Sequence, residues 1–161
     1  LLATVDWHAD GYELFSIAAP AGSSQAGFFG EISESNCFTV PRAAMEAIGG
    51  FDERFRSSGG GLVNLHVHNQ LMDRPELQPV MLLGEATFHQ FHGGVSTNVP
   101  AEQSPFSRYA EEYAAIFGRP YERSWRPPLY FGTCPEPARR FLLVGAIPAP
   151  PSAPPAAQAA R

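Results

Sequence analysis

The sequence has too few basic residues for a protein whose main partner is nucleic acid. Its 161 residues include 11 Lys and Arg against 16 Asp and Glu, a net charge of -5, and phosphate binding requires a basic face. No apolar run approaches the roughly 20 residues that span a bilayer, and no basic segment followed by an apolar one marks a signal peptide. We therefore expect no nucleic-acid partner, no transmembrane segment and a cytoplasmic location. A location peripheral to the inner membrane stays an open alternative for a full-length form.

Cysteine and the common catalytic motifs are also scarce. The two cysteines, Cys37 and Cys134, lie far apart and in no metal-binding spacing, which predicts two reduced thiols, with Cys37 in the core. The sequence has no Gly-x-Ser-x-Gly, no Rossmann glycine fingerprint, and no Gly-Lys-Ser/Thr after its glycine run. Nucleophilic catalysis, dinucleotide binding and a phosphate loop are therefore unsupported.

The composition is that of a globular domain. Hydrophobic residues make up 44% and charged residues 17% of the chain, and this length suffices for one domain with its own core. We expect that domain to span residues 1–145. Residues 146–161 are rich in Pro and Ala, which predicts a disordered tail. Because the chain begins with Leu1, we expect a fragment of a longer protein.

Local patterns predict a mixed α/β fold. Short apolar runs predict strands at 12–18, 37–40 and 80–83. Helices are expected at 41–48, 62–72 and 105–117, with a shorter one within 137–145. Pro41 and Pro105 fit the first helical position, and glycines follow the first and third of these helices, where helices often end.

The strand predicted at 80–83, which we expect to be buried, leads into a candidate site. It ends at Gly84 and is followed by Glu85, His89 and His92. Open α/β sheets place ligands at the carboxyl ends of their strands, and histidine with carboxylate suits a divalent metal or acid–base chemistry. Two histidines alone make a weak metal site, so the alternative is a structural pair beside a glycine turn.

Two more histidines, His66 and His68, fall within the predicted helix at 62–72. Residues two apart on a helix point in different directions, so we expect solvent-exposed or interface histidines rather than a metal pair. The competing hypothesis is a small His-rich metal-dependent hydrolase that uses His66, His68, His89 and His92 and binds zinc without any nucleotide.

The order of the segments is more specific than any one of them. Glu34-Ser35-Asn36, the segment GGFDERF at 49–55, the segment GGGLVNL at 59–65 and the segment FHQFHGG at 88–94 follow one another along the chain. This order resembles the C-terminal half of a family-2-like nucleotide-sugar glycosyltransferase of the GT-A fold, and within that family a bacterial subgroup. The resemblance runs from about residue 7 to about residue 141.

The resemblance implies a partial GT-A fold, a mixed sheet with flanking helices that lacks its N-terminal nucleotide-binding half. It implies transfer of a sugar from a nucleotide diphosphate sugar to a saccharide or other hydroxyl acceptor. A divalent cation, Mn or Mg, would be held on the donor diphosphate and bind weakly without it, with His89 as the first and His92 as the second late ligand. The substrate-binding residues that it implies are Glu34, Ser35, Asn36, Gly60 and Gly61.

Two departures from the family pattern bear on activity. No Asp-x-Asp motif, which binds the metal in the family, occurs anywhere in the chain, so we expect the chain alone to be inactive. The acceptor helix carries His66 where the similar subgroup has Asp. Histidine can act as a base at neutral pH, or the exchange marks a degenerate, non-catalytic interaction domain. The candidate catalytic residues are His66, Asn64, Asp52 and Glu53.

Overall fold

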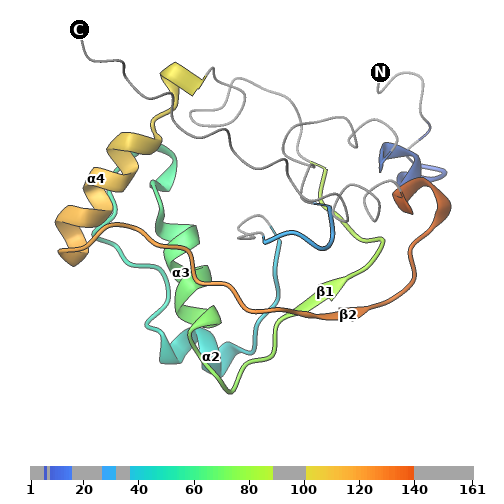
Figure 1. Cartoon of the computed structure of the whole chain (residues 1–161), viewed down its shortest axis with the longest axis horizontal. Coiled ribbons are helices and arrows are strands. Elements are labelled where there is room, and N and C mark those ends of the chain that lie inside the picture. The colour runs from blue at the N-terminus through green and yellow to red at the C-terminus, as the bar shows by residue number, and fades with distance from the viewer. Residues whose placement is uncertain (1–5, 7, 16–26, 32–36, 89–100, 140–161) are drawn as a thin grey trace, which may run out of the picture. The chain divides into compact units, whose positions relative to one another are not determined.

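The computed structural model describes residues 6, 8–15, 27–31, 37–88 and 101–139 (Figure 1). The chain divides into two compact units, one formed by residues 31–135 and the other by residues 1–30 together with 136–161. The larger unit contains all of the strands and α-helices discussed below, and it carries the candidate site.

In the smaller unit a short 3-10 helix, η2 (Gly11–Glu13), lies where the sequence predicted the start of a strand at 12–18. The backbone N–H of Tyr12 donates to the Asp10 carboxylate (N to Oδ1, 2.9 Å), so Asp10 caps the first turn. This cap favours a helical start, and the prediction is wrong over 12–15. Phe15 is buried beside Phe28, with their ring centroids 6.3 Å apart. Near the other end of the chain, η6 (Glu136–Ala138) is a 3-10 turn.

The described residues of the larger unit form three α-helices, two strands and two 3-10 turns. In chain order they are α2 (Arg42–Ala47), η4 (Ser58–Gly60), α3 (Val63–Met72), β1 (Val80–Leu82), η5 (Ala101–Gln103), α4 (Phe106–Phe117) and β2 (Leu129–Phe131). The helices predicted at 41–48, 62–72 and 105–117 are confirmed, and the shorter one expected within 137–145 lies largely outside the described residues. Pro41 and Pro105 are the N-cap residues of α2 and α4, one position before the place expected for them.

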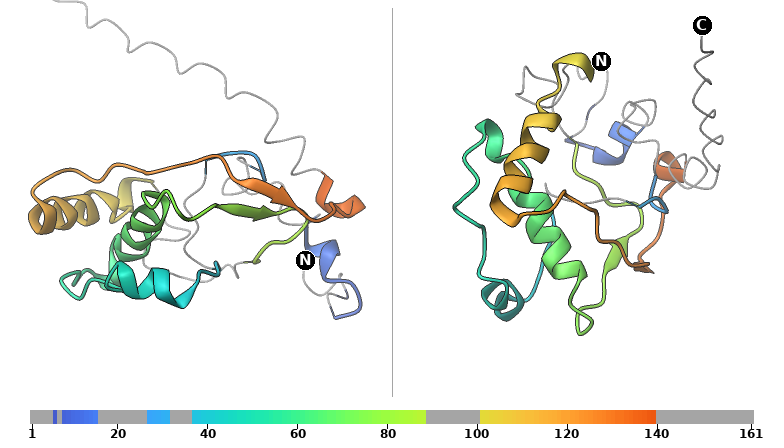
Figure 2. Two further views of the ribbon diagram at one scale, coloured as in Figure 1. Left: turned by 90° about the horizontal axis from the view of Figure 1, so that it is seen from below. Right: turned by 60° about the vertical axis from the view of Figure 1, so that its left-hand side comes forward.

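Helix α3 packs against a different helix at each end (Figures 1 and 2). Its N-cap residue Leu62 belongs to a cluster with Phe55 and with Tyr109 and Tyr113 of α4. Further along, α3 shares a second cluster with α2, formed by Val67, Leu71 and Ala44. Burying one such Val or Leu side chain contributes about 1.5–3 kcal/mol. These two clusters fix α3 between α2 and α4.

Strands β1 and β2 form a two-stranded parallel sheet, and the left view of Figure 2 shows the two arrows beside each other and pointing the same way. Their register pairs Val80 with Leu129 and Leu82 with Phe131. The strand prediction at 80–83 is confirmed at Val80–Leu82, but its expected burial is wrong, since Val80 and Leu82 are 54% and 53% exposed. Strand β2 was not predicted. The described elements are mixed α/β, and a partial GT-A fold stays a prediction.

Gly84 ends β1 with a positive φ of 79°. A Cβ at this position would lie 2.5 Å from the Thr133 carbonyl oxygen and equally close to Pro135. Only glycine therefore lets the chain after β1 run so close to the chain that follows β2.

The segment before α2 differs from its prediction. Residues 38–40 lie in no strand, and Cys37 is exposed instead of in the core. Val40 alone of this short run packs on the cluster that α2 and α3 share. Within the described part of the chain, no helix is long and apolar enough to cross a membrane.

Candidate functional site

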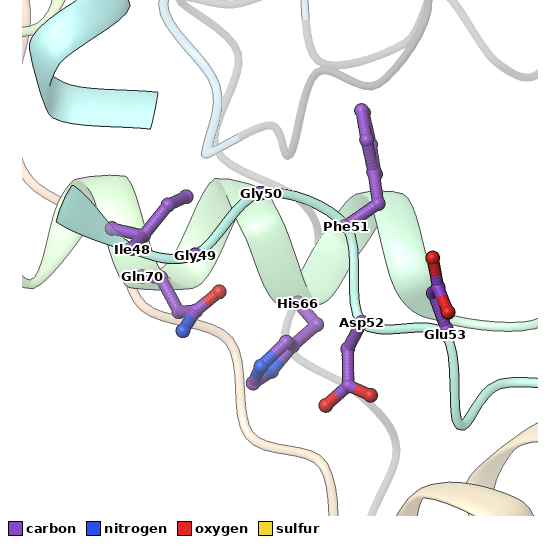
Figure 3. A pocket seen from close by; sticks show the side chains of 8 residues that line it. All are labelled: Ile48, Gly49, Gly50, Phe51, Asp52, Glu53, His66 and Gln70. Atoms are coloured by element: carbon purple, nitrogen blue, oxygen red, sulfur yellow. The ribbon is translucent and has the colours of Figure 1, made fainter. Parts of the chain in front are cut away.

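A pocket of about 350 Å³ lies between the turn after α2 and one face of α3 (Figure 3). This size is at the lower end of the range for small-molecule sites. The residues that line it are Ile48, Gly49, Gly50, Phe51, Asp52, Glu53, His66 and Gln70.

Two glycines bring the turn onto α3. Gly49 and Gly50 follow α2 with φ values of 80° and 73°, and the N–H of Gly50 donates to the Met45 carbonyl oxygen (3.1 Å). This left-handed ending reverses the chain at low cost because glycine has no Cβ. On α3, His66 and Gln70 are four residues apart and share one face. The side chains of Gln70, His66 and Asp52 extend to the same side of the turn (Figure 3).

His66 is only 8% exposed and is surrounded by aromatic rings. Its imidazole stacks on Phe117 with ring centroids 4.4 Å apart, and Phe55 lies 6.0 Å away. Nδ1 is 3.3 Å from the Tyr113 hydroxyl oxygen, which leaves Nε2 as the ring nitrogen for a ligand in the pocket. Burial lowers the pKa of His66, and this outweighs the carboxylate of Asp52, which acts to raise it. The imidazole is therefore neutral at pH 7.

Asp52 is held by a bidentate ion pair with Arg54. The distances are 3.0 Å from Nε to Oδ1 and 2.6 Å from Nη2 to Oδ2, and the backbone N–H of Arg54 also donates to Oδ1. These hydrogen bonds, the side-chain ones first, lower the pKa of Asp52 to about 2. The guanidinium carbon also lies 4.9 Å from the centroid of the Phe117 ring. Asp52 is therefore a fixed negative charge beside the ring of His66.

Helix α4 clamps the loop that leads into α3. Glu112 Oε1 accepts hydrogen bonds from the backbone N–H groups of Arg56 (2.6 Å) and Ser57 (2.8 Å). The Tyr109 hydroxyl donates to the Ser58 carbonyl oxygen (2.7 Å). Burial acts to raise the pKa of Glu112, but the hydrogen bonds from Arg56 and Ser57 together lower it. Gly61 has a φ of 56°, and a Cβ there would lie 2.6 Å from Glu112 Oε2, so a larger residue would be strained and would displace the Glu112 carboxylate.

A second polar residue that sequence reasoning missed is Asn69, which lies on α3 but does not line the pocket. Its Nδ2 donates to the Glu122 carbonyl oxygen (2.6 Å), and its Oδ1 accepts from the Ser124 N–H (3.0 Å). Asn69 thus binds the segment after α4 to α3. The helical positions of Glu112 and Asn69 were visible in the sequence, but their backbone partners, more than 50 residues away in the chain, were not.

The structure brings some of the predicted site residues together. Asp52, Glu53 and His66 line one pocket, whereas Asn64 is exposed and Gly60 and Gly61 lie in the preceding loop, none of them among its lining residues. The remaining candidates lie outside the described residues; they are Glu34, Ser35, Asn36, His89 and His92.

The expectation that His66 and His68 face solvent or an interface is wrong, since they are 8% and 7% exposed. Because α3 packs on both α2 and α4, it buries residues on several faces, including adjacent polar ones.

The described residues offer no ready metal site. Among residues 6, 8–15, 27–31, 37–88 and 101–139, no three His, Cys, Asp or Glu side chains lie where they could hold one ion.

No protein-family model, curated protein or solved structure matches the chain.

Proposed function

We propose that this chain is the acceptor-side part of a GT-A glycosyltransferase, which transfers a sugar from a nucleotide diphosphate sugar to a hydroxyl acceptor. One observation carries the proposal. The turn of the GGFDERF segment and the helix after the glycine loop, the two segments on which the resemblance depends most, face each other across one pocket. His66 is one of the two lining residues on that helix, and it stands at the position that the resemblance gives to the catalytic base.

In the proposed reaction His66 is the base. An acceptor hydroxyl in the pocket gives its proton to the neutral Nε2, and its oxygen forms a bond to the anomeric carbon of the donor. The bond from that carbon to the diphosphate oxygen breaks, and the diphosphate leaves with the electron pair. The carboxylate of Asp52 favours the charged form of His66, so it stabilises the imidazolium as it forms.

The proposed reaction also needs a nucleotide-binding half and a metal ion, and neither is provided by the described residues. The chain has no Asp-x-Asp motif, and the described residues do not provide a metal site. A Mn or Mg ion on the donor diphosphate, with His89 and His92 as late ligands, stays a prediction because both histidines lie outside the described residues.

The test is turnover of nucleotide sugars by the full-length polypeptide that contains this chain. We expect transfer or hydrolysis by that protein and none by the 161-residue chain. His66→Gln in the full-length protein should lower kcat by about 10²–10⁴-fold, the usual contribution of a positioned base. Gln103→Leu, an exposed change in η5, is the matched control.

One observation favours a second candidate, a degenerate glycosyltransferase-like interaction domain. His66 is enclosed by Phe55, Tyr113 and Phe117, an environment in which an imidazole can serve packing alone. The same experiment separates the two candidates. A full-length protein that binds and turns over no nucleotide sugar would reject the enzyme and leave the interaction domain.

A further inference from the structure

The pocket offers hydrogen-bonding groups without cationic ones. Its lining includes the carboxylates of Asp52 and Glu53, the neutral imidazole of His66 and the amide of Gln70, and none of its residues is Lys or Arg. The guanidinium of Arg54, two residues after Asp52 in the chain, is bound to Asp52 and to the Ile116 carbonyl oxygen. A phosphate binds best to charge-assisted donors, which this lining does not supply.

Gln70 has the chemistry to recognise a hydroxyl group. Its amide carries both donors and an acceptor, and within the described residues its side chain makes no hydrogen bond. It is half-buried and lies one helical turn from His66, on the same face of α3. A ligand whose hydroxyl reaches Nε2 of His66 would therefore place a neighbouring hydroxyl beside the Gln70 amide.

We propose that the pocket binds an uncharged sugar, with Gln70 as the residue that recognises a hydroxyl adjacent to the one facing His66. The lining disfavours phosphorylated sugars, because it carries two carboxylates and contains no Lys or Arg to pair with a phosphate. This inference rests on the proposed function for its reactive hydroxyl, but the binding that it predicts needs neither a donor nor turnover.

The test follows the His66 imidazole by NMR while the 161-residue chain is titrated with sugars. The probes are glucose, galactose, mannose and N-acetylglucosamine, each compared with its 6-phosphate, and the His66 resonance is assigned from the His66→Gln spectrum. We expect a saturable shift of that resonance with at least one neutral sugar. The matching phosphate should bind about tenfold more weakly or worse.

Two variants locate the recognition at Gln70. Gln70→Leu should weaken binding of the neutral sugar about tenfold, the effect of losing two neutral hydrogen bonds, while Gln103→Leu binds as the wild type does. Gln70→Glu keeps the size of the side chain, and it replaces Gln70→Leu in the titration if the leucine variant does not fold. It should retain part of the neutral-sugar affinity and weaken the phosphate further.

Three results would overturn the inference: no shift of His66 with any neutral sugar, a sugar phosphate that binds as tightly as its parent, or a folded Gln70→Leu chain with unchanged affinity. Failure of the proposed function looks different. Sugar binding that depends on Gln70, in a full-length protein that transfers nothing, would reject the enzyme and keep this site. Sugar transfer by a full-length protein whose rate and acceptor affinity are unchanged by Gln70→Leu would support the enzyme and reject Gln70 as the recognition residue.

Discussion

At the scale of single residues, burial and one ion pair set the charges at the pocket. The aromatic rings around His66 remove water from an imidazole that would otherwise be half-protonated near pH 6.5. Asp52 has the opposite environment, a bidentate guanidinium and a backbone N–H, and stays ionised. The neutral imidazole of His66 thus lies beside the ionised carboxylate of Asp52. The protonation state of each can be tested through the pH dependence of the protein's stability.

His66 should make the protein less stable as the pH falls below about 6.5. Because its pKa is lowered in the folded state, the unfolded chain binds more protons in that range, and the free energy of unfolding decreases. His66→Phe keeps a ring in the cluster and removes the titration, so its stability should change less between pH 6.5 and pH 5. Denaturant unfolding across that range measures the difference.

Tyr113→Phe is the matched control for that experiment. It removes the hydroxyl beside Nδ1 but keeps the burial that is the main cause of the shift, so the wild-type pH dependence should persist. If the free energy of unfolding had the same slope against pH in the wild type and in His66→Phe, His66 would have the same pKa in the folded and the unfolded state, which would contradict the prediction.

Asp52 should affect the pH dependence of stability at a lower pH than His66 does. Its pKa falls from 3.8 to about 2 on folding, so its contribution to stability is complete above about pH 4 and is lost as the pH falls towards 2. We expect Asp52→Asn to lower the melting temperature at pH 7, with the difference from wild type shrinking below pH 4. Thermal unfolding followed by circular dichroism provides the measurement, and a difference that stays constant down to pH 2 would contradict the assignment.

At the scale of elements, α4 positions the start of α3 through the Glu112 carboxylate. Glu112→Ala leaves the N–H groups of Arg56 and Ser57 without their acceptor. We expect a loss of about 1–2 kcal/mol in the free energy of unfolding and faster proteolysis within residues 56–61. Glu112→Gln keeps a carbonyl acceptor and should lose less.

Glu111→Ala is the comparison, since this neighbour on α4 is exposed and has no such contact with the loop. If the alanine variants at 111 and 112 were equally stable and equally resistant to protease, the clamp would have no energetic role.

At the scale of the whole molecule, the sequence predicted what is encoded locally. Helix α4 could be found because its apolar stripe recurs at helical spacing and Gly118 follows it with a φ of 68°. Strand β2 could not, because a run of three exposed residues in a proline-rich segment becomes a strand only by pairing with β1.

The burial of His66 and His68 escaped prediction for a related reason. Spacing along α3 shows which residues share a face, but not that α2 and α4 cover different faces of this helix. The resemblance grouped His66 with Asp52 and Glu53. Gln70 and Glu112 were missed, because their roles depend on tertiary neighbours and not on any motif.

The parallel pairing of β1 with β2 has a consequence for synthesis on the ribosome. Val80–Leu82 emerges first, and its partner Leu129–Phe131 follows only after residues 83–128 have been made. Parallel pairs across so long a connection form late, since the chain must close a large loop first. During that interval the nascent chain presents an apolar strand with open edges, a natural target for chaperones and for misassembly between neighbouring chains.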